Sequence, residues 1–177
     1  MILRLSQKLC TKIKEGSLKA MPLDDNPFAD WTASLFVADR TRYIIVSNTK
    51  SLYSTVLFAK GITSDGHLIM RALGSLREFM EDDGQAFVYH RFVAPASASV
   101  RFAKALNRAV TGSMNELILH ATAMLVAGEL SPFDVGFSLN DVLLSAIAPS
   151  KSAKYGRPRE AFKAMQAALA ARDADEA

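Results

Sequence analysis

The stretch 33-ASLFVADRTRYIIVSNTKSLYSTVLFA-59 decides the fold that this sequence predicts. Three runs in it, at 33–38, 42–48 and 52–59, are rich in Val, Ile, Tyr and Phe, which favour strands. The links between the runs, Asp-Arg-Thr and Asn-Thr-Lys, are so short that consecutive strands can only be antiparallel. The stretch therefore predicts a three-stranded antiparallel meander.

Helices are needed to cover this sheet, because both faces of the middle run are apolar. The stretch 65–83 places its apolar residues on one helical stripe, and Ser64 can cap its start. A second helix is predicted at 113–127, where Ser113 and Glu116 form the S-x-x-E pattern of a capping box. These are the two main helices of the predicted fold.

The flanking segments add shorter elements. We expect a helix at 6–14, a long loop at 15–30, a strand at 85–93, a strand at 99–105 (where a helical pattern also fits), a short strand and a helical turn or two within 129–150, and a closing helix that Pro158 opens. The sequence thus predicts the α+β class, with a mostly antiparallel sheet of four to six strands and two main helices packed against it. We expect a single domain at 1–170, followed by a flexible acidic tail at 171–177.

Composition and charge are typical of a globular domain without a membrane span. Apolar residues make up 50% of the 177 positions, and the longest helix-like apolar run, 117–127, falls short of the roughly 20 residues that a bilayer requires. Arg4, Gln7 and Lys8 interrupt the N-terminal run, so it lacks the apolar core of a signal peptide. Cys10 is the single cysteine and cannot form an internal disulfide. We therefore expect a cytoplasmic protein with no membrane partner.

One candidate site is the polar run 107-NRAVTGSMNE-116 in front of the second helix. The capping box explains Ser113 and Glu116 as structure alone. The remaining polar residues leave a second interpretation open, because a helix start exposes unpaired N–H groups that attract anions. On that interpretation, a small anion or other ligand contacts Asn107, Arg108, Thr111, Gly112, Ser113 and Asn115, together with Trp31 at the end of the long loop.

A second candidate site is the basic segment 151-KSAKYGRPREAFKAM-165. Basic residues around an aromatic ring can contact the phosphates and a base of a nucleic acid. The residues concerned are Lys151, Lys154, Tyr155, Arg157, Arg159 and Lys163. Arg40 and Arg42 are candidates to extend the same patch. A solvated linker before a surface helix is the structural alternative.

The sequence holds no recognisable catalytic or metal-binding set. The three histidines stand alone, and neither H-E-x-x-H nor C-x-x-C occurs. Cys10 falls on the apolar face of the first predicted helix, where a buried and inert thiol is expected. There is also no G-x-S-x-G nucleophile motif. The sequence therefore predicts no metal and no cofactor, and it favours a protein that is not an enzyme.

Five pieces of the chain resemble an uncharacterised family of small bacterial proteins that carry a domain of unknown function. They are MILRLSQKL, PLDDNPFADW with the meander after it, NRAVTGSMNEL, SPFDVGFSLND and YGRPREAF. The chain departs from the family pattern at Thr32, where a histidine is expected after Trp31, and at Thr111, where a leucine is expected. The resemblance implies a single α+β domain and no assigned activity. Relatives near mobile-element genes also suggest a link to nucleic-acid biology.

Two classes of function follow from these observations. The first is a non-enzymatic binding or interaction protein, associated with nucleic acid or mobile elements, whose partner is a nucleic acid or another protein. The second is a small-ligand or anion-binding protein, or an enzyme, that uses the helix start at 107–116. The absence of a catalytic set favours the first class.

Overall fold

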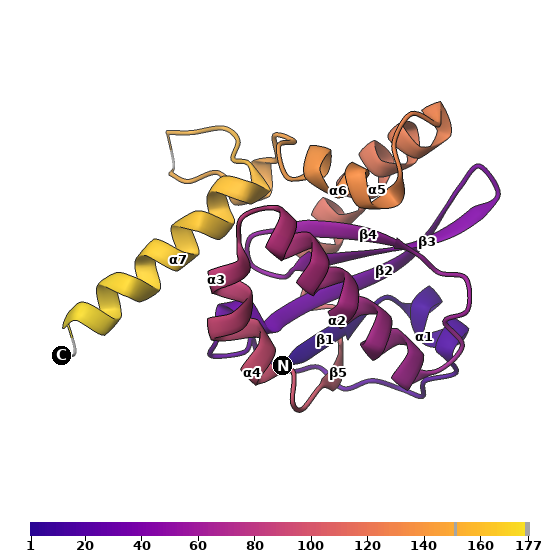
Figure 1. Ribbon diagram of the computed structural model, residues 1–177, viewed down its shortest axis with the longest axis horizontal. Coiled ribbons are helices and arrows are strands. Elements are labelled where there is room, and N and C mark those ends of the chain that lie inside the picture. The colour runs from indigo at the N-terminus through magenta and orange to yellow at the C-terminus, as the bar shows by residue number, and fades with distance from the viewer. Residues whose placement is uncertain (151, 176–177) are drawn as a thin grey trace.

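A five-stranded mixed sheet forms the centre of the molecule. The computed structural model describes the backbone of residues 1–150 and 152–175, and the side chains of these residues up to 169. The strands lie in the order β4-β3-β2-β1-β5. Figure 1 shows α2 crossing one face of this sheet, with α5 on its other side and α6 beside the edge strand β4.

The predicted meander is confirmed. It consists of β2 (Asp30–Ala38), β3 (Thr41–Asn48) and β4 (Ser54–Phe58), and each consecutive pair is antiparallel. Side chains on the two faces of these strands belong to two separate apolar clusters. Ile44 belongs to the cluster under α2, and Ile45 belongs to the cluster under α5. The expectation that both faces would be covered is therefore also confirmed.

The sheet is not mostly antiparallel, as the sequence had predicted, but mixed. β1 (Ile2–Leu5) lies between β2 and β5 (Arg101–Lys104), and it is parallel to both. Its link to β2 passes through α1 (Gln7–Ile13) and the long loop, which gives enough chain for a parallel crossover. Two of the predictions are confirmed: the sheet has between four and six strands, and one of them lies within 99–105.

The face under α2 (Asp65–Asp82) holds the larger apolar cluster. Ser64 caps this helix as predicted. The strand expected at 85–93 is instead helical: α3 (Ala86–Val88), the π-helical turn η2 (Tyr89–Val93) and α4 (Ala94–Ala96) follow one another. Val88 and Val93 turn their side chains into the cluster from this helical path. Because Pro95 lacks an N–H group, it cannot donate the regular i→i−4 hydrogen bond here.

The opposite face is covered by α5 (Arg108–Ala127) and α6 (Pro132–Leu139), so more than two helices pack on the sheet. The short strand expected within 129–150 is wrong, because Ser131 caps a helix there by accepting from the Asp134 amide. The Asn140 side chain then bonds the backbone N–H and C=O of Ser54, as a neighbouring strand would. α6 and Asn140 thus close the β4 edge of the sheet.

The remaining elements connect these layers. η1 (Pro27–Ala29) ends the long loop, η3 (Ser145–Ile147) follows α6, and α7 (Pro158–Asp175) closes the chain, opened by proline as expected. Figure 1 shows α7 extending away from the sheet. The predicted tail at 171–177 falls on the last residues of α7 and on residues 176–177, which lie outside the described residues.

Gly136 is the position in α6 where a larger residue should destabilise the fold. A Cβ atom there would lie 2.7 Å from Cε2 of Phe79, a fully buried ring. We expect Gly136→Ala to lower the free energy of unfolding by about 1–3 kcal/mol, because this overpacking outweighs the better helix propensity of alanine. Urea denaturation measures the change.

Gly112→Ala is the matched control, since Gly112 lies inside α5 with open space around its Cα. This variant should gain up to about 1 kcal/mol. Equal effects of the two substitutions would contradict the predicted clash with Phe79.

Candidate functional site

α5 begins at Arg108, five residues before the predicted Ser113. Asn107 is its cap: the side-chain Oδ1 accepts from the Val110 amide at 3.0 Å. The Ser113 hydroxyl instead donates to the carbonyl of Ala109 at 3.1 Å, in the second turn of the helix. The capping box at Ser113 is therefore a wrong prediction, because Asn107 offers an equally good cap and residues 108–112 fit a helix.

This earlier start changes what the predicted anion site can offer. The amides of Gly112 and Ser113 lie within the helix, where they donate to carbonyls one turn back. Ser113 is buried, whereas Asn107, Arg108, Thr111, Gly112 and Asn115 are exposed along the first turns of α5. Ligand binding by these exposed residues stays a prediction.

The structure does not bring Trp31 to this helix. Trp31 is fully buried in the cluster under α2, on the opposite face of the sheet from α5. Its ring N–H donates to the carbonyl of Phe28 at 2.8 Å, and its ring lies 6.3 Å from that of Phe162. Trp31 therefore anchors the long loop to the core and does not line a site with residues 107–115.

A groove of about 840 Å³ lies where β1 and β5 end, between α1, the loop at 15–18 and α5. The two strands are parallel and pair Leu5 with Lys104, so their carboxyl ends meet at this groove. Its lining combines hydroxyls, two charged side chains and apolar side chains: Ser6, Ser17, Thr32, Ser34 and Thr111; Glu15 and Lys104; Leu5, Leu18 and Met114. Thr111 is the residue of the predicted ligand site that lines it.

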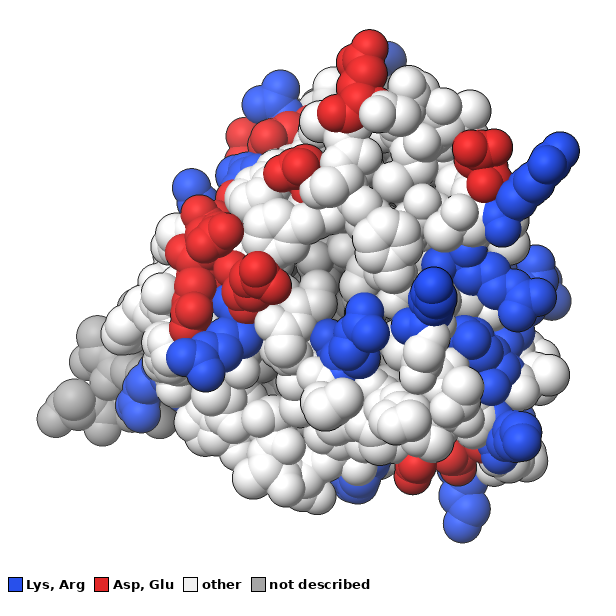
Figure 2. Space-filling view, turned by 45° about the vertical axis from the view of Figure 1, so that its right-hand side comes forward, with Lys and Arg blue, Asp and Glu red and all other residues white. Residues whose placement is uncertain are grey.

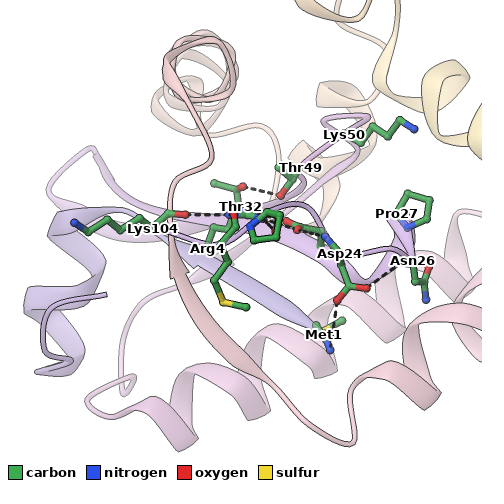
Figure 3. Close-up of polar contacts among 12 residues, drawn as sticks. Met1, Arg4, Asp24, Asn26, Pro27, Thr32, Thr49, Lys50 and Lys104 are labelled. Carbon is green, nitrogen blue, oxygen red and sulfur yellow. Dashed lines mark hydrogen bonds and ion pairs between the residues drawn. The ribbon is translucent and has the colours of Figure 1, made fainter. Parts of the chain in front are cut away.

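A buried arginine, Arg4, precedes the groove residue Leu5 on β1. Arg4 is fully buried, and its Nε and Nη2 donate to the two carboxylate oxygens of Asp30, each at 2.8 Å. The guanidinium also donates to the carbonyls of Met21, Pro22 and Lys104. Figure 3 shows the Lys104 carbonyl facing Arg4 while the Lys104 side chain extends away from it. Arg4 thus joins the long loop to the end of β5.

Sequence reasoning missed both Arg4 and the groove. In the sequence, Arg4 is notable only as a charged residue that interrupts the N-terminal apolar run. The available signal was a single base inside the apolar run MILRL, which is typical of a buried charge with a partner. The groove gave no comparable signal, because its residues come from segments far apart in the chain.

Cys10 lines the groove but is not an activated nucleophile. Its side chain is buried as expected, and burial, together with the nearby Glu15 carboxylate, raises the pKa of the thiol. The protonated thiol is the dominant form at neutral pH and is a poor nucleophile. Among the residues that the structure describes, no three His, Cys, Asp or Glu side chains gather as a metal site would require.

The predicted nucleic-acid segment is only partly free to bind a partner. Lys154, Tyr155 and Lys163 are exposed. Arg157 forms an ion pair with Glu160 at 3.6 Å. Lys151 lies outside the described residues.

Arg159, the other arginine of this segment, joins three helices. Its guanidinium forms ion pairs with Asp83 and Asp141 and donates to the carbonyl of Phe137. These contacts hold the start of α7 against α2 and α6. Arg40 and Arg42, which were considered as an extension of this segment, lie on the β2–β3 hairpin at the other side of the molecule (Figure 1).

Comparison with known proteins agrees with the resemblance seen in the sequence. The pattern of the domain of unknown function DUF6933 matches residues 2–161, which is most of the chain. No curated protein and no solved structure matches. In the part of the chain that the structure describes, no helix is both long and apolar enough to cross a membrane. The chain thus belongs to the DUF6933 family, whose description names no activity.

Proposed function

We propose that the protein binds a small polar ligand with an acidic group in the groove between β1, β5 and α5, and that it does so without catalysis. The observation that carries this proposal is the position of the groove. It lies at the carboxyl ends of two adjacent parallel strands, which are followed by α1 and α5 on opposite faces of the sheet. Ligands of open sheets with parallel strands bind in crevices of this kind.

The lining suits a ligand of this class. A volume of about 840 Å³ falls in the range of small-molecule sites. Lys104 supplies a cation for an acidic group, and the hydroxyls of Ser34 and Thr111 supply hydrogen bonds. Glu15 lies in the same groove and disfavours a second acidic group nearby. The protonated Cys10 supplies no nucleophile, which favours binding over covalent chemistry.

NMR titration with a panel of small phosphates and carboxylates tests this proposal. We expect the amide signals of Ser34, Lys104 and Thr111 to shift on addition of a bound compound. Lys104→Ala should weaken its binding by about ten-fold, the loss expected for one charge-assisted contact. Glu15→Gln should tighten it, because a repelling carboxylate is removed.

Lys50→Ala is the control, since Lys50 is an exposed lysine that does not line the groove. The proposal fails if no compound shifts the groove signals. It also fails if Lys50→Ala and Lys104→Ala weaken binding equally.

Contact between nucleic acid and the segment at 151–163 remains a separate prediction from the sequence. The exposure of Lys154, Tyr155 and Lys163 supports it, whereas the ion pairs of Arg157 and Arg159 leave fewer cations for phosphates. This segment and the surface proposed in the next subsection are rival contacts for nucleic acid, and the charge reversals compared there decide between them.

A further inference from the structure

The β2–β3 hairpin extends beyond the rest of the sheet as a two-stranded ribbon. β1 ends at Leu5, opposite Ala33, and β4 ends at Phe58, opposite Tyr43. In the strand ladders, residues 37–38 and 41–42 therefore pair only with each other, and one further backbone hydrogen bond, from the Ala59 amide to the Arg42 carbonyl, holds the base of the ribbon. Figure 1 shows this ribbon projecting from the body of the molecule.

The ribbon carries two exposed arginines at its end. Arg40 lies in the turn at φ 62°, beside Asp39 at φ 43°. Glycine is favoured at such a position, and another residue there costs roughly 1–2 kcal/mol. Arg42 follows on the first residues of β3 and is also exposed. The turn thus keeps a long cationic side chain at a position where its backbone conformation is unfavourable.

Further bases lie beside the ribbon. The Arg42 carbonyl accepts from the Ala59 amide, so Lys60 follows directly next to it. The Ser6 amide donates to the Ala33 carbonyl, and this bond sets the start of α1 against β2 below the ribbon. α1 buries Leu9, Cys10 and Ile13, and it leaves Lys8 and Lys12 on its outer side.

We call Lys8, Lys12, Arg40, Arg42 and Lys60 the basic face. Figure 2 shows Lys and Arg gathered toward the right of this side of the molecule, while most Asp and Glu lie toward its left and top. Among the described residues, none of the five bases forms an ion pair, in contrast to Arg77 and Arg159. Their charges are therefore available to an anionic partner.

We propose that the basic face binds duplex DNA, with the ribbon at 37–42 in the major groove and the α1 lysines on flanking phosphates. A two-stranded β-ribbon has the width that the major groove admits. Lysine and arginine side chains on both sides of the ribbon match the two phosphate backbones that border the groove. This inference concerns a different surface from the ligand groove and does not rest on it.

Fluorescence anisotropy with a short labelled DNA duplex of random sequence tests the inference. We expect the parent protein to bind with an affinity that falls steeply as salt is added. Arg40→Glu/Arg42→Glu should weaken binding by about ten-fold or more and make it less dependent on salt, because two cations near the phosphates are replaced by anions. Lys8→Glu/Lys12→Glu on α1 should weaken it in the same direction, which guards against a local effect on the hairpin.

Lys154→Glu/Lys163→Glu is the matched control, because it makes the same charge change at two exposed lysines of the segment at 151–163. It should bind DNA nearly as well as the parent, and so should Lys104→Ala. The inference is overturned if the parent does not bind the duplex, or if the two glutamate pairs at 40/42 and 154/163 weaken binding equally. Binding to anionic vesicles without binding to DNA would also overturn it and indicate a membrane surface as the partner.

Discussion

Replacing Arg4 by methionine is expected to lower the free energy of unfolding by about 3–5 kcal/mol, the usual cost of removing one partner of a buried ion pair. Arg4 and Asp30 are both buried, with 0% and 1% of their surfaces exposed. Without the guanidinium, the Asp30 carboxylate keeps the Asp24 amide as a donor at 3.0 Å but loses its counter-charge. The carbonyls of Met21 and Pro22 lose a donor as well. Urea denaturation at neutral pH measures the loss.

The double variant Arg4→Met/Asp30→Asn distinguishes this explanation from simple loss of packing. An asparagine removes the uncompensated charge and still accepts from the Asp24 amide, so the double variant should be more stable than Arg4→Met alone. The single variant Asp30→Asn completes the comparison. If the losses in the free energy of unfolding of Arg4→Met and Asp30→Asn add up to the loss in the double variant, the ion pair is not the origin of the effect. Ligand binding in the groove is a second property to measure in Arg4→Met. Arg4 joins the long loop to the end of β5, where the groove lies.

The local parts of the fold could be predicted from the sequence, and the distant pairings could not. The meander at 33–59 follows from short links and strand-forming residues that are neighbours in the chain. β1 has only four residues, and its partner strands begin at Asp30 and Arg101, so no local pattern reveals that it pairs in parallel on both sides. Arg4 adds to the difficulty, because a charged residue normally indicates an exposed position.

Two apolar segments were predicted as strands because short runs do not separate the periods of helix and strand. In α6, Val135 and Leu139 contact the cluster under α5, while Phe133 and Phe137 lie against Phe79 on the other side. A helix that covers the edge of a sheet thus has apolar residues on two sides, and its sequence alternates as a strand would. The Ser131 cap and Pro132 were the signals that indicated a helix.

In the candidate site, too, the local features could be predicted and the contacts between distant segments could not. The polar residues before α5 could be recognised, but two possible caps, Asn107 and Ser113, lie six positions apart, and sequence alone does not choose between them. The groove needs Lys104, Glu15 and Thr111 to come together from three separate segments. Such a site depends on the parallel pairing of β1 and β5, which the sequence did not predict.

Phe162→Ala should be the most damaging substitution in α7, with an expected loss of about 3–5 kcal/mol in the free energy of unfolding. Phe162 is fully buried, and its ring stacks on Tyr53 with ring centres 4.3 Å apart. The ring also meets the edge of Phe28 at 5.0 Å. Truncation leaves a cavity between Phe28, Trp31 and Tyr53, and it removes the main apolar anchor of a helix that otherwise extends away from the body. Urea denaturation and limited proteolysis within α7 measure the two effects.

Phe162→Leu is the control, because it keeps most of the apolar volume and should cost less than about 1.5 kcal/mol. Arg159, one turn earlier, holds α7 through Asp83, which also accepts from the Tyr53 hydroxyl at 2.6 Å. If this polar contact were sufficient to dock α7, Phe162→Ala would leave the proteolysis pattern unchanged, and that result would contradict the prediction. We expect faster cleavage instead, because an ion pair that is partly open to water contributes little without the buried ring beside it.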